Sequence, residues 1–167
     1  DDRRKFIDGA ISQYNKPYLE SLIKYNKVLA QRNVLLKEFS RNGKSDTDML
    51  EVYDAQLCQY GETIHEIRKS FMEELMVFFQ EFYSHISNNS EEVLLIYESQ
   101  LNNASLDSLL KQSVQKDLAL EYTTTGIHKD DLLLEMNGFP VKSLGSQGQQ
   151  KSYLVALKLA KFDYIKR

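Results

Sequence analysis

Two long stretches with the apolar period of a helix, separated by a short polar turn, restrict most strongly what this chain can fold into. Apolar side chains recur at spacings of three and four from about residue 18 to 39, and again from 48 to about 85. Such spacing predicts two helices, each with one buried face. A connection as short as residues 40–46 predicts that they pair as an antiparallel helical hairpin of residues 17–39 and 48–85. The expected buried positions are Leu19, Leu22, Asn26, Leu29, Asn33 and Leu36, then Leu50, Leu57, Tyr60, Ile64, Ile67, Phe71, Leu75, Phe78 and Phe82.

Charge supports the pairing of these two helices. Residues 16–44 hold seven basic and two acidic side chains, a net charge of +5, whereas residues 46–92 hold two basic and eleven acidic ones, a net charge of −9. An exposed ion pair contributes only about 0–1 kcal/mol, so this asymmetry selects the pairing more than it adds stability. The basic side chains have two interpretations, a surface that faces DNA phosphates and an ordinary solvated face. They are Lys24, Lys27, Arg32, Lys37 and Arg41.

The second half of the chain adds strands to this helical pattern. Residues 93–97, 120–124 and 132–136 are rich in β-favouring side chains and predict three short strands. Asn137-Gly138 predicts a tight hairpin turn, and residues 106–118 predict an amphipathic helix capped by Ser105 or a neighbour. We therefore expect a mainly helical α+β chain. Its expected parts are a helical arm over residues 1–86 and a part with strands and helices over residues 87–167.

The totals exclude several classes of protein. Cys58 is the single cysteine, which excludes an internal disulfide and a multi-cysteine metal site. A net charge of −3 gives no general basic signature for nucleic acid, so any DNA contact needs a local patch. No apolar run approaches the roughly 20 residues that span a bilayer, and residues 1–5 lack a signal-peptide core. A cytoplasmic setting without a membrane partner is expected.

A small polar turn, residues 144–151, opens directly into an apolar run from Tyr153 to Phe162. Ser146 is placed as a helix N-cap, and Gln149 three residues later completes a capping box. The backbone amides of Gln147, Gly148 and Gln149 are then expected at a helix N-terminus, which attracts anions such as phosphate. An ordinary capped helix is the alternative interpretation.

A second candidate phosphate loop fails on its spacing. Gly43-Lys44-Ser45 imitates the end of a Walker A loop, but that motif needs a glycine five positions before Gly43, where Glu38 stands. It also needs an apolar strand before it, where a helix is predicted. We therefore expect an exposed turn at these residues.

Four segments resemble the RecF family of bacterial recombination mediators, relatives of the SMC and Rad50 ATPases with an ABC-type head. Ser146-Gln147-Gly148-Gln149-Gln150, followed by Lys151 and its helix, resembles the family's signature motif. The others are Arg3-Arg4 with Phe6 and Asp8, Gln31-Arg32-Asn33 with Leu35-Leu36, and the segment from Gly126 to Leu132. The last resembles Gly-Pro-His-Arg-Asp-Asp-Leu, with Ile127 in place of proline and Lys129 in place of arginine. Matches in family order over nearly the whole chain are more specific than any one alone.

The resemblance implies a long antiparallel helical hairpin, the lid, joined to a small antiparallel β edge and the signature helix of an ABC-type head. It implies an internal fragment of an ATP-dependent DNA-binding protein. That protein acts at single-strand gaps and single-strand/double-strand junctions in repair, recombination, replication and the SOS response. Its implied partners are DNA, other recombination mediators, and RecA, which it helps to load.

The resemblance also assigns roles to the signature residues. ATP in this family is sandwiched between the heads of an ATP-dependent homodimer, and one subunit presents its signature to the nucleotide of the other. Ser146 hydroxyl and Gly148 N–H would contact the γ-phosphate, and Gln147, Gln149 and Gln150 would shape the turn and interface. Lys151 would add positive charge. The chain lacks a Walker A lysine and a Walker B carboxylate, so alone it is not expected to bind ATP tightly or hydrolyse it. The full-length protein is implied to be a weak DNA-dependent ATPase that uses Mg.

The segment His128, Lys129, Asp130 and Asp131 has more than one interpretation. Histidine at this spacing is no zinc signature without further ligands. A hydrogen-bonded turn that stabilises itself is one possibility, and the resemblance adds a loop near the nucleotide or the head interface.

Two competing hypotheses remain for the chain as a whole. One is a non-enzymatic coiled-coil interaction module whose capped helix only ends a scaffold. The other is a lid fragment of a different SMC- or Rad50-like ATPase.

Overall fold

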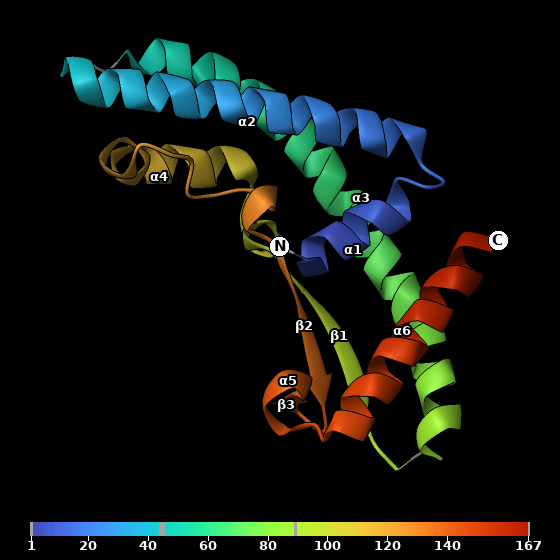
Figure 1. Cartoon of the computed structure of the whole chain (residues 1–167). Coiled ribbons are helices and arrows are strands. Elements are labelled where there is room, and N and C mark those ends of the chain that lie inside the picture. The colour runs from blue at the N-terminus through green and yellow to red at the C-terminus, as the bar shows by residue number, and fades with distance from the viewer. Residues whose placement is uncertain (1, 44–45, 89, 167) are drawn as a thin grey trace. The chain divides into compact units, whose positions relative to one another are not determined.

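The computed structural model describes residues 2–43, 46–88 and 90–166, and it is mainly helical with a small antiparallel sheet (Figure 1). The chain forms two compact units. The hairpin unit comprises residues 15–67 and 99–130, and the sheet unit comprises residues 1–14, 68–98 and 131–167. Helix α3 (Thr47–Ser87) contributes to both units. The expected parts 1–86 and 87–167 divide the chain differently, and that division stays a prediction.

The hairpin unit is built on α2 (Lys16–Asn42) and the first part of α3, which run antiparallel as predicted (Figure 1). Asn15 caps α2, because its Oδ1 accepts the Tyr18 amide at 2.9 Å, and Pro17 occupies the first turn. Gly43 ends α2 in the left-handed region at φ 64° and donates its N–H to the Phe39 carbonyl. It therefore serves as a helix cap. Lys44 and Ser45, the rest of the apparent Walker A sequence, lie outside the described residues.

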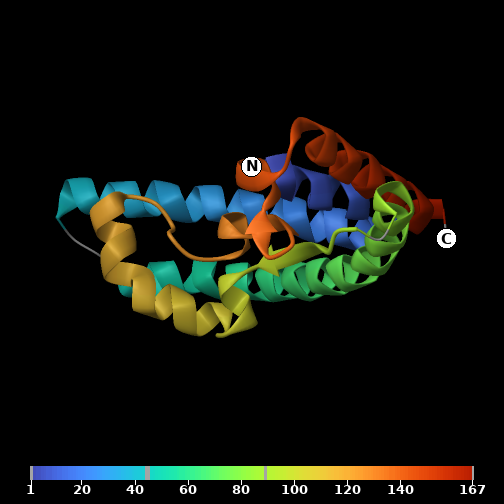
Figure 2. The same ribbon diagram turned by 90° about the horizontal axis from the view of Figure 1, so that it is seen from below.

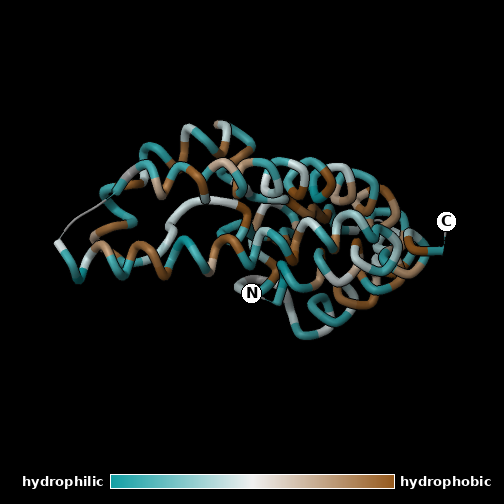
Figure 3. Tube along the Cα trace, turned by 90° about the horizontal axis from the view of Figure 1, so that it is seen from above, coloured by the Kyte–Doolittle hydropathy of each residue, from teal (hydrophilic) through white to brown (hydrophobic). Residues whose placement is uncertain are grey.

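The buried faces of the two helices match the prediction unequally. Leu50, Leu57 and Ile64 of α3 are at most 2% exposed, as expected. On α2 the predicted stripe is partly wrong, since Leu19 is 37% exposed whereas Tyr18 and Tyr25 are fully buried. The first buried positions of α2 are occupied by tyrosines, which are large and amphipathic. A stripe defined by aliphatic residues therefore misses them. Figure 3 shows hydrophobic (brown) and hydrophilic (teal) positions alternating along the turns of the long helices.

Helix α4 (Leu106–Leu120) follows η1 (Gln100–Asn102) and completes the hairpin unit together with η2 (Ile127–Lys129). Ser105 caps α4 as predicted, with its side chain accepting the Ser108 amide at 3.3 Å. The helix packs closely on α3, since a Cβ at Gly61 would lie 2.6 Å from Leu106 Cδ2.

The strand predicted over residues 120–124 is wrong. Leu120 ends α4, Glu121 follows in the left-handed region at φ 60°, and the next residues form an irregular loop. Thr123 and Thr124 favour strands by composition, but side-chain acceptors bind their backbone amides. Asn33 Oδ1 accepts the Thr123 amide at 2.7 Å, and Asp117 Oδ1 accepts the Thr124 amide at 2.9 Å. Tertiary hydrogen bonds have overridden local propensity.

In the sheet unit, the described strands form one antiparallel sheet in the order β1 (Val93–Glu98), β2 (Asp131–Met136) and β3 (Phe139–Pro140). Val93 pairs with Met136 at one end and Glu98 with Asp131 at the other. The turn before β3 is the predicted one. Asn137 and Gly138 have φ of 50° and 78°, as a two-residue turn between twisted strands requires.

Aromatic side chains hold α6 (Gln147–Lys166) against the second part of α3, and the two helices lie side by side in Figures 1 and 2. The ring centroids of Tyr153 and Phe79 lie 4.6 Å apart, and those of Tyr164 and Phe71 lie 4.9 Å apart. The same unit contains α1 (Asp2–Ile11), which the sequence interpretation did not include, and the single turn α5 (Val141–Leu144). An ion pair of 2.9 Å between Arg68 and Asp8 joins α1 to α3.

Candidate functional site

The turn that precedes α6 forms the predicted capping box. Gln149 N–H donates to Ser146 Oγ at 3.2 Å, and Ser146 N–H donates to Gln149 Oε1 at 2.7 Å. Gln147 and Gly148 are the first residues of α6. Their backbone N–H groups have no hydrogen-bond acceptor within the helix, because a helical N–H bonds to the carbonyl four residues earlier. Ser146, Gln147 and Gly148 are all exposed. The turn therefore offers amide donors and a hydroxyl at an accessible helix N-terminus.

The two glycines of this turn, Gly145 and Gly148, lie in different surroundings. A Cβ at Gly145 would lie 2.7 Å from the Val141 carbonyl oxygen, so this glycine permits a close approach of the backbone to α5. A Cβ at Gly148 would meet only Ser146 Oγ, at 3.9 Å. The space next to the Gly148 Cα is therefore open, and this residue has no side chain that would keep an anion away from the turn.

The remaining predicted residues of the turn differ in how firmly they are held. Gln150 Nε2 donates to the Gly145 carbonyl at 2.8 Å, which closes the turn on itself. Lys151 is exposed on the first turn of α6. One turn along the helix, Tyr153 is buried and donates its hydroxyl to the Leu94 carbonyl of β1 at 2.8 Å. Burial raises the pKa of Tyr153 above its ordinary value.

A carboxylate that the sequence interpretation missed lies beside the capping box. Glu91, just before β1, accepts hydrogen bonds from Gln149 Nε2 and from the hydroxyl of Tyr83 on α3. Tyr83 is 1% exposed. Burial and the Glu91 hydrogen bond raise the pKa of Tyr83. No local motif marks Glu91, because its two partners lie 8 and 58 residues away.

The segment His128–Asp131 is spread over different environments. His128 Nδ1 lies 3.0 Å from the Tyr25 hydroxyl, and Nε2 lies 3.0 Å from the Thr123 carbonyl oxygen. Both ring nitrogens therefore have structural partners within the hairpin unit. Lys129 is exposed with Nζ 5.0 Å from the centre of the Tyr122 ring, and Asp130 is buried. Asp131 belongs to the sheet unit, where it forms an ion pair of 2.5 Å with Arg3. A nucleotide or interface role of these four residues stays a prediction.

Gly126 controls the shape of this loop, which gives a test. Its φ of 119° is unsuited to other residues, and a Cβ there would lie 2.5 Å from the Tyr25 hydroxyl. We expect Gly126→Ala to destabilise the hairpin unit by about 2–4 kcal/mol, from backbone strain and the displaced Tyr25–His128 contact. Hydrogen exchange of α2 and α4 amides measures this loss. Gly9→Ala is the control, because a Cβ at that helical position meets nothing within 4 Å. Equal exchange in the two variants would contradict the argument.

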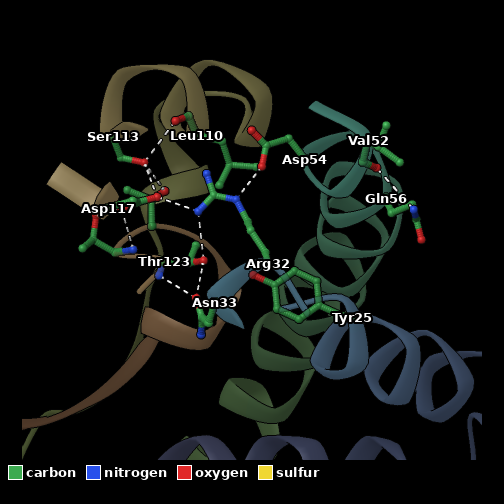
Figure 4. Close-up of polar contacts among 12 residues, drawn as sticks. Tyr25, Arg32, Asn33, Val52, Asp54, Gln56, Leu110, Ser113, Asp117 and Thr123 are labelled. Atoms are coloured by element: carbon green, nitrogen blue, oxygen red, sulfur yellow. Dashed lines mark hydrogen bonds and ion pairs between the residues drawn. The ribbon is translucent and has the colours of Figure 1, made fainter. Parts of the chain in front are cut away.

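Of the five candidate DNA-facing residues, Arg32 is the one that is buried and so cannot contact DNA. Its side chain is 0% exposed. The guanidinium donates from Nε to Asp54 at 2.6 Å and from Nη1 to Asp117 at 2.7 Å (Figure 4). A buried cation needs such carboxylates, since charge is costly to remove from water. Arg32 therefore links α2 to α3 and α4, and the prediction that it faces DNA is wrong.

The same network explains how the loop after α4 is fixed. Arg32 Nη1 also donates to Thr123 Oγ1 at 2.9 Å, and the Thr123 hydroxyl donates to Asn33 Oδ1 at 2.7 Å. Burial raises the pKa of the Asp54 carboxyl above its ordinary value, against the opposing effect of the Arg32 guanidinium. A signal for Asp54 existed in the sequence, because it falls on the apolar stripe between Leu50 and Leu57.

The four other candidate cations of α2 are exposed. Lys24, Lys27, Lys37 and Arg41 all lie at the surface, and Lys24 Nζ is 5.8 Å from the centre of the Tyr60 ring.

Cys58 is half-buried, and burial raises the pKa of its thiol to about 11, so little reactive thiolate forms at neutral pH. Within the described residues, no cluster of three or more His, Cys, Asp or Glu side chains could hold a metal ion. No helix in those ranges has the length and apolar character of a membrane span.

Known proteins similar to this chain share one description. A DNA replication and repair protein RecF of Flavobacterium johnsoniae is 49% identical over 165 residues, 99% of this chain and 46% of the relative. A RecF of Bacteroides thetaiotaomicron is 49% identical over 168 residues, 100% of this chain and 44% of the relative. No family model matches the chain. The chain thus spans slightly less than half the length of these curated relatives.

Solved structures agree with the sequence relatives. A structure described as the recombination mediator protein RecF-ATPrS in the RecFOR pathway superposes with a TM-score of 0.92 at 32% identity, covering 99% of this chain and 46% of that one. A second, described as RecF-ATP, gives a TM-score of 0.91 at 33% identity with the same coverage. With its fold and nearly all of its residues matched, the chain belongs to the RecF family.

Proposed function

We propose that this chain supplies the signature part and helical lid of an ATP-binding recombination mediator that acts on DNA in repair and replication. The curated relatives are described as DNA replication and repair proteins, and the two structural relatives are described with ATP or ATPrS. Each covers nearly the whole chain. This supports a transfer of the general role, and the chemistry of the turn before α6 supports a specific part in it.

The observation that carries the proposal is the exposed capping box. Ser146 Oγ accepts the Gln149 amide, so its hydroxyl hydrogen remains to donate outward. The Gln147 and Gly148 amides begin α6, where the aligned peptide dipoles favour negative charge. Together these donors suit the oxygens of a terminal phosphate. Lys151 on the first turn adds a positive charge.

The phosphate is proposed to belong to ATP held by a second subunit. The chain carries no complete Walker A sequence, since Glu38 stands where the first glycine would be needed before Gly43-Lys44-Ser45. The opposing subunit would hold ATP and Mg, and the signature would complete the site across an ATP-dependent homodimer. On this proposal the isolated chain neither binds ATP tightly nor hydrolyses it, whereas the full-length protein is a weak DNA-dependent ATPase.

DNA binding is proposed for the exposed cations of α2. Lys24, Lys27, Lys37 and Arg41 give this helix a local positive surface in a chain whose net charge is −3. Such a surface would contact the phosphate backbone and give salt-dependent affinity without reading sequence. Gapped DNA and single-strand/double-strand junctions are the proposed targets, in the cytoplasm, with other mediators and RecA loading as partners.

Photolabelling tests the position of the signature. A full-length RecF that carries this chain would be irradiated with an ATP analogue bearing a photoreactive group on the γ-phosphate. Trypsin cuts after Lys142 and Lys151, so the signature leaves as the peptide of residues 143–151. We expect label on this peptide because its amides and hydroxyl would contact the γ-phosphate. Label on the peptide of residues 117–129 would place the His128 loop near the nucleotide as well.

Isotope-labelled subunits make that experiment specific for contact between subunits. A heavy-isotope form whose Walker A lysine is replaced cannot hold ATP itself, so label on its residues 143–151 must come from the nucleotide of a partner. An unlabelled heavy peptide, with labelling confined to other parts of the protein, would overturn the proposal.

A further inference from the structure

We propose that Glu91 is the positioning residue of the signature turn, holding Gln149 in the one orientation that keeps the capping box formed. This inference rests on the proposed role of Ser146 and Gly148 at a phosphate. Glu91 precedes β1 and lies 58 residues from Gln149. It touches none of the proposed phosphate donors directly and would act through Gln149.

The hydrogen bonds of Gln149 explain why a carboxylate is needed. Its Oε1 accepts the Ser146 amide at 2.7 Å, and its Nε2 donates to Glu91. A glutamine side chain can turn over, exchanging its oxygen and nitrogen. Turned over, it would set its NH2 group against the Ser146 N–H, two donors facing each other. A carboxylate can only accept, so Glu91 selects the orientation that also caps α6.

Glu91 is itself held in place from two sides. Its other oxygen accepts the hydroxyl of Tyr83, whose ring is buried against Phe79 and Tyr153 with centroids 6.0 and 5.9 Å away. The Tyr83 hydroxyl is protonated at neutral pH and so can donate to this carboxylate. The next residue is fixed through its backbone, because Glu92 N–H donates to Asn137 Oδ1 at 2.9 Å and Asn137 N–H donates to the Glu92 carbonyl at 2.8 Å.

These contacts connect the hydrophobic packing of α3 and α6 to the polar turn. The aromatic rings fix Tyr83, Tyr83 and the β hairpin fix Glu91, and Glu91 fixes Gln149. Gln149 then fixes Ser146 at both its amide and its hydroxyl. Positioning donors before a ligand arrives lowers the entropy lost when it binds. The turn would therefore meet a phosphate already in its binding shape.

The test compares Glu91→Gln with Glu92→Gln in a full-length RecF that carries this chain. Glu92 has an exposed side chain, so its substitution removes the same charge next to the turn without touching Gln149. A glutamine at position 91 is neutral and presents both a donor and an acceptor, so the charged acceptor of Gln149 Nε2 is lost and residue 91 no longer selects one orientation of Gln149. We expect ATP-driven dimerisation to weaken about 10-fold, as for a lost hydrogen bond to a charged group. Glu92→Gln should dimerise as the parent does, and all variants should bind ATP as monomers equally.

A reciprocal exchange separates positioning from general stability. In Glu91→Gln/Gln149→Glu, the carboxylate now at position 149 accepts from Ser146 N–H and from the side-chain amide now at position 91. The oxygen of that same amide accepts the Tyr83 hydroxyl. Every donor is again matched, and glutamate serves the capping box as well as glutamine does. We expect the exchange to restore most of the dimerisation that Glu91→Gln loses. No rescue, or an equal loss in Glu92→Gln, would overturn the proposal.

Ser146→Arg distinguishes the two levels of the argument. If this variant keeps ATP-driven dimerisation, the proposed function itself fails. If Ser146→Arg loses dimerisation while Glu91→Gln keeps it in full, only the role of Glu91 fails. Dimerisation is read by analytical ultracentrifugation with ATP, and monomer binding by equilibrium dialysis at protein concentrations below dimerisation.

Discussion

Replacing Asp117 with alanine is expected to destabilise the hairpin unit by about 3–5 kcal/mol, the cost of leaving a buried charge without its partner. Arg32 and Asp117 are both 0% exposed and are joined at 2.7 Å. Without Asp117 the guanidinium keeps Asp54 and Thr123, but Nη2 already has no hydrogen-bond partner among the described residues. The remaining contacts therefore cannot compensate for the loss.

Asp117 accepts hydrogen bonds from other residues besides Arg32. Its Oδ2 also accepts the Ser113 hydroxyl at 3.1 Å, and its Oδ1 accepts both the amide and the hydroxyl of Thr124, at 2.9 and 2.6 Å. Alanine would leave these donors without that acceptor, and the loop from residue 121 to 125 would lose its attachment to α4. Loosening of this loop should accompany the loss of stability.

Hydrogen exchange measures this effect in a full-length RecF that carries this chain, because amides of α2 and α4 report opening of the hairpin unit. A loss of 3–5 kcal/mol corresponds to exchange about 150- to 5,000-fold faster. Asp107→Ala is the matched control, since Asp107 lies on the same helix in an exposed ion pair with Lys111. It should leave exchange nearly unchanged. Similar exchange in both variants would show that the buried pair is not what holds these helices together.

Local chemistry was sufficient for the elements that the sequence predicted correctly. Asn137-Gly138 determines its own turn, because glycine and asparagine tolerate positive φ. Ser146 and Gln149 are three residues apart and satisfy each other. The long helices follow from apolar period and from caps such as Asn15 and Ser105. In each case the groups that decide the structure lie within a few residues of one another.

The failures share the opposite property. Arg32 appeared to be one of several basic residues on a helix surface, and only its partners Asp54 and Asp117, 22 and 85 residues away, make it a core residue. Residues 120–124 have strand composition, but Asn33 accepts the Thr123 amide from 90 residues away. Glu91 went unnoticed for the same reason. Asp54 falls on the apolar stripe between Leu50 and Leu57, which indicates burial, but no sequence pattern shows which distant residue it pairs with. A single sequence therefore does not reveal these long-range pairings.

Ser146→Arg in a full-length RecF that carries this chain is expected to abolish ATP-driven dimerisation and to leave ATP binding by the monomer nearly unchanged. Arginine has no acceptor for the Gln149 amide, so the capping box is lost together with the hydroxyl proposed to donate to phosphate. Its long, charged side chain would also occupy the first turn of α6, where the open space next to Gly148 would otherwise admit a partner's phosphate. On the proposed function, the Walker groups that hold ATP lie elsewhere in the full-length protein and are not touched, so the monomer should still bind ATP.

The measurement pairs sedimentation with ATP, which reports dimer, with equilibrium dialysis of labelled ATP at protein concentrations too low for dimers. Ser70→Arg is the control, because it places the same side chain at an exposed helical serine of the sheet unit. It should behave as the parent in both assays. An equal loss of monomer binding and dimerisation in Ser146→Arg would mean that the turn serves its own subunit's nucleotide. Intact dimerisation would mean that α6 is only a capped helix, since a bulky cation at its first turn could not be accommodated against a partner's phosphate.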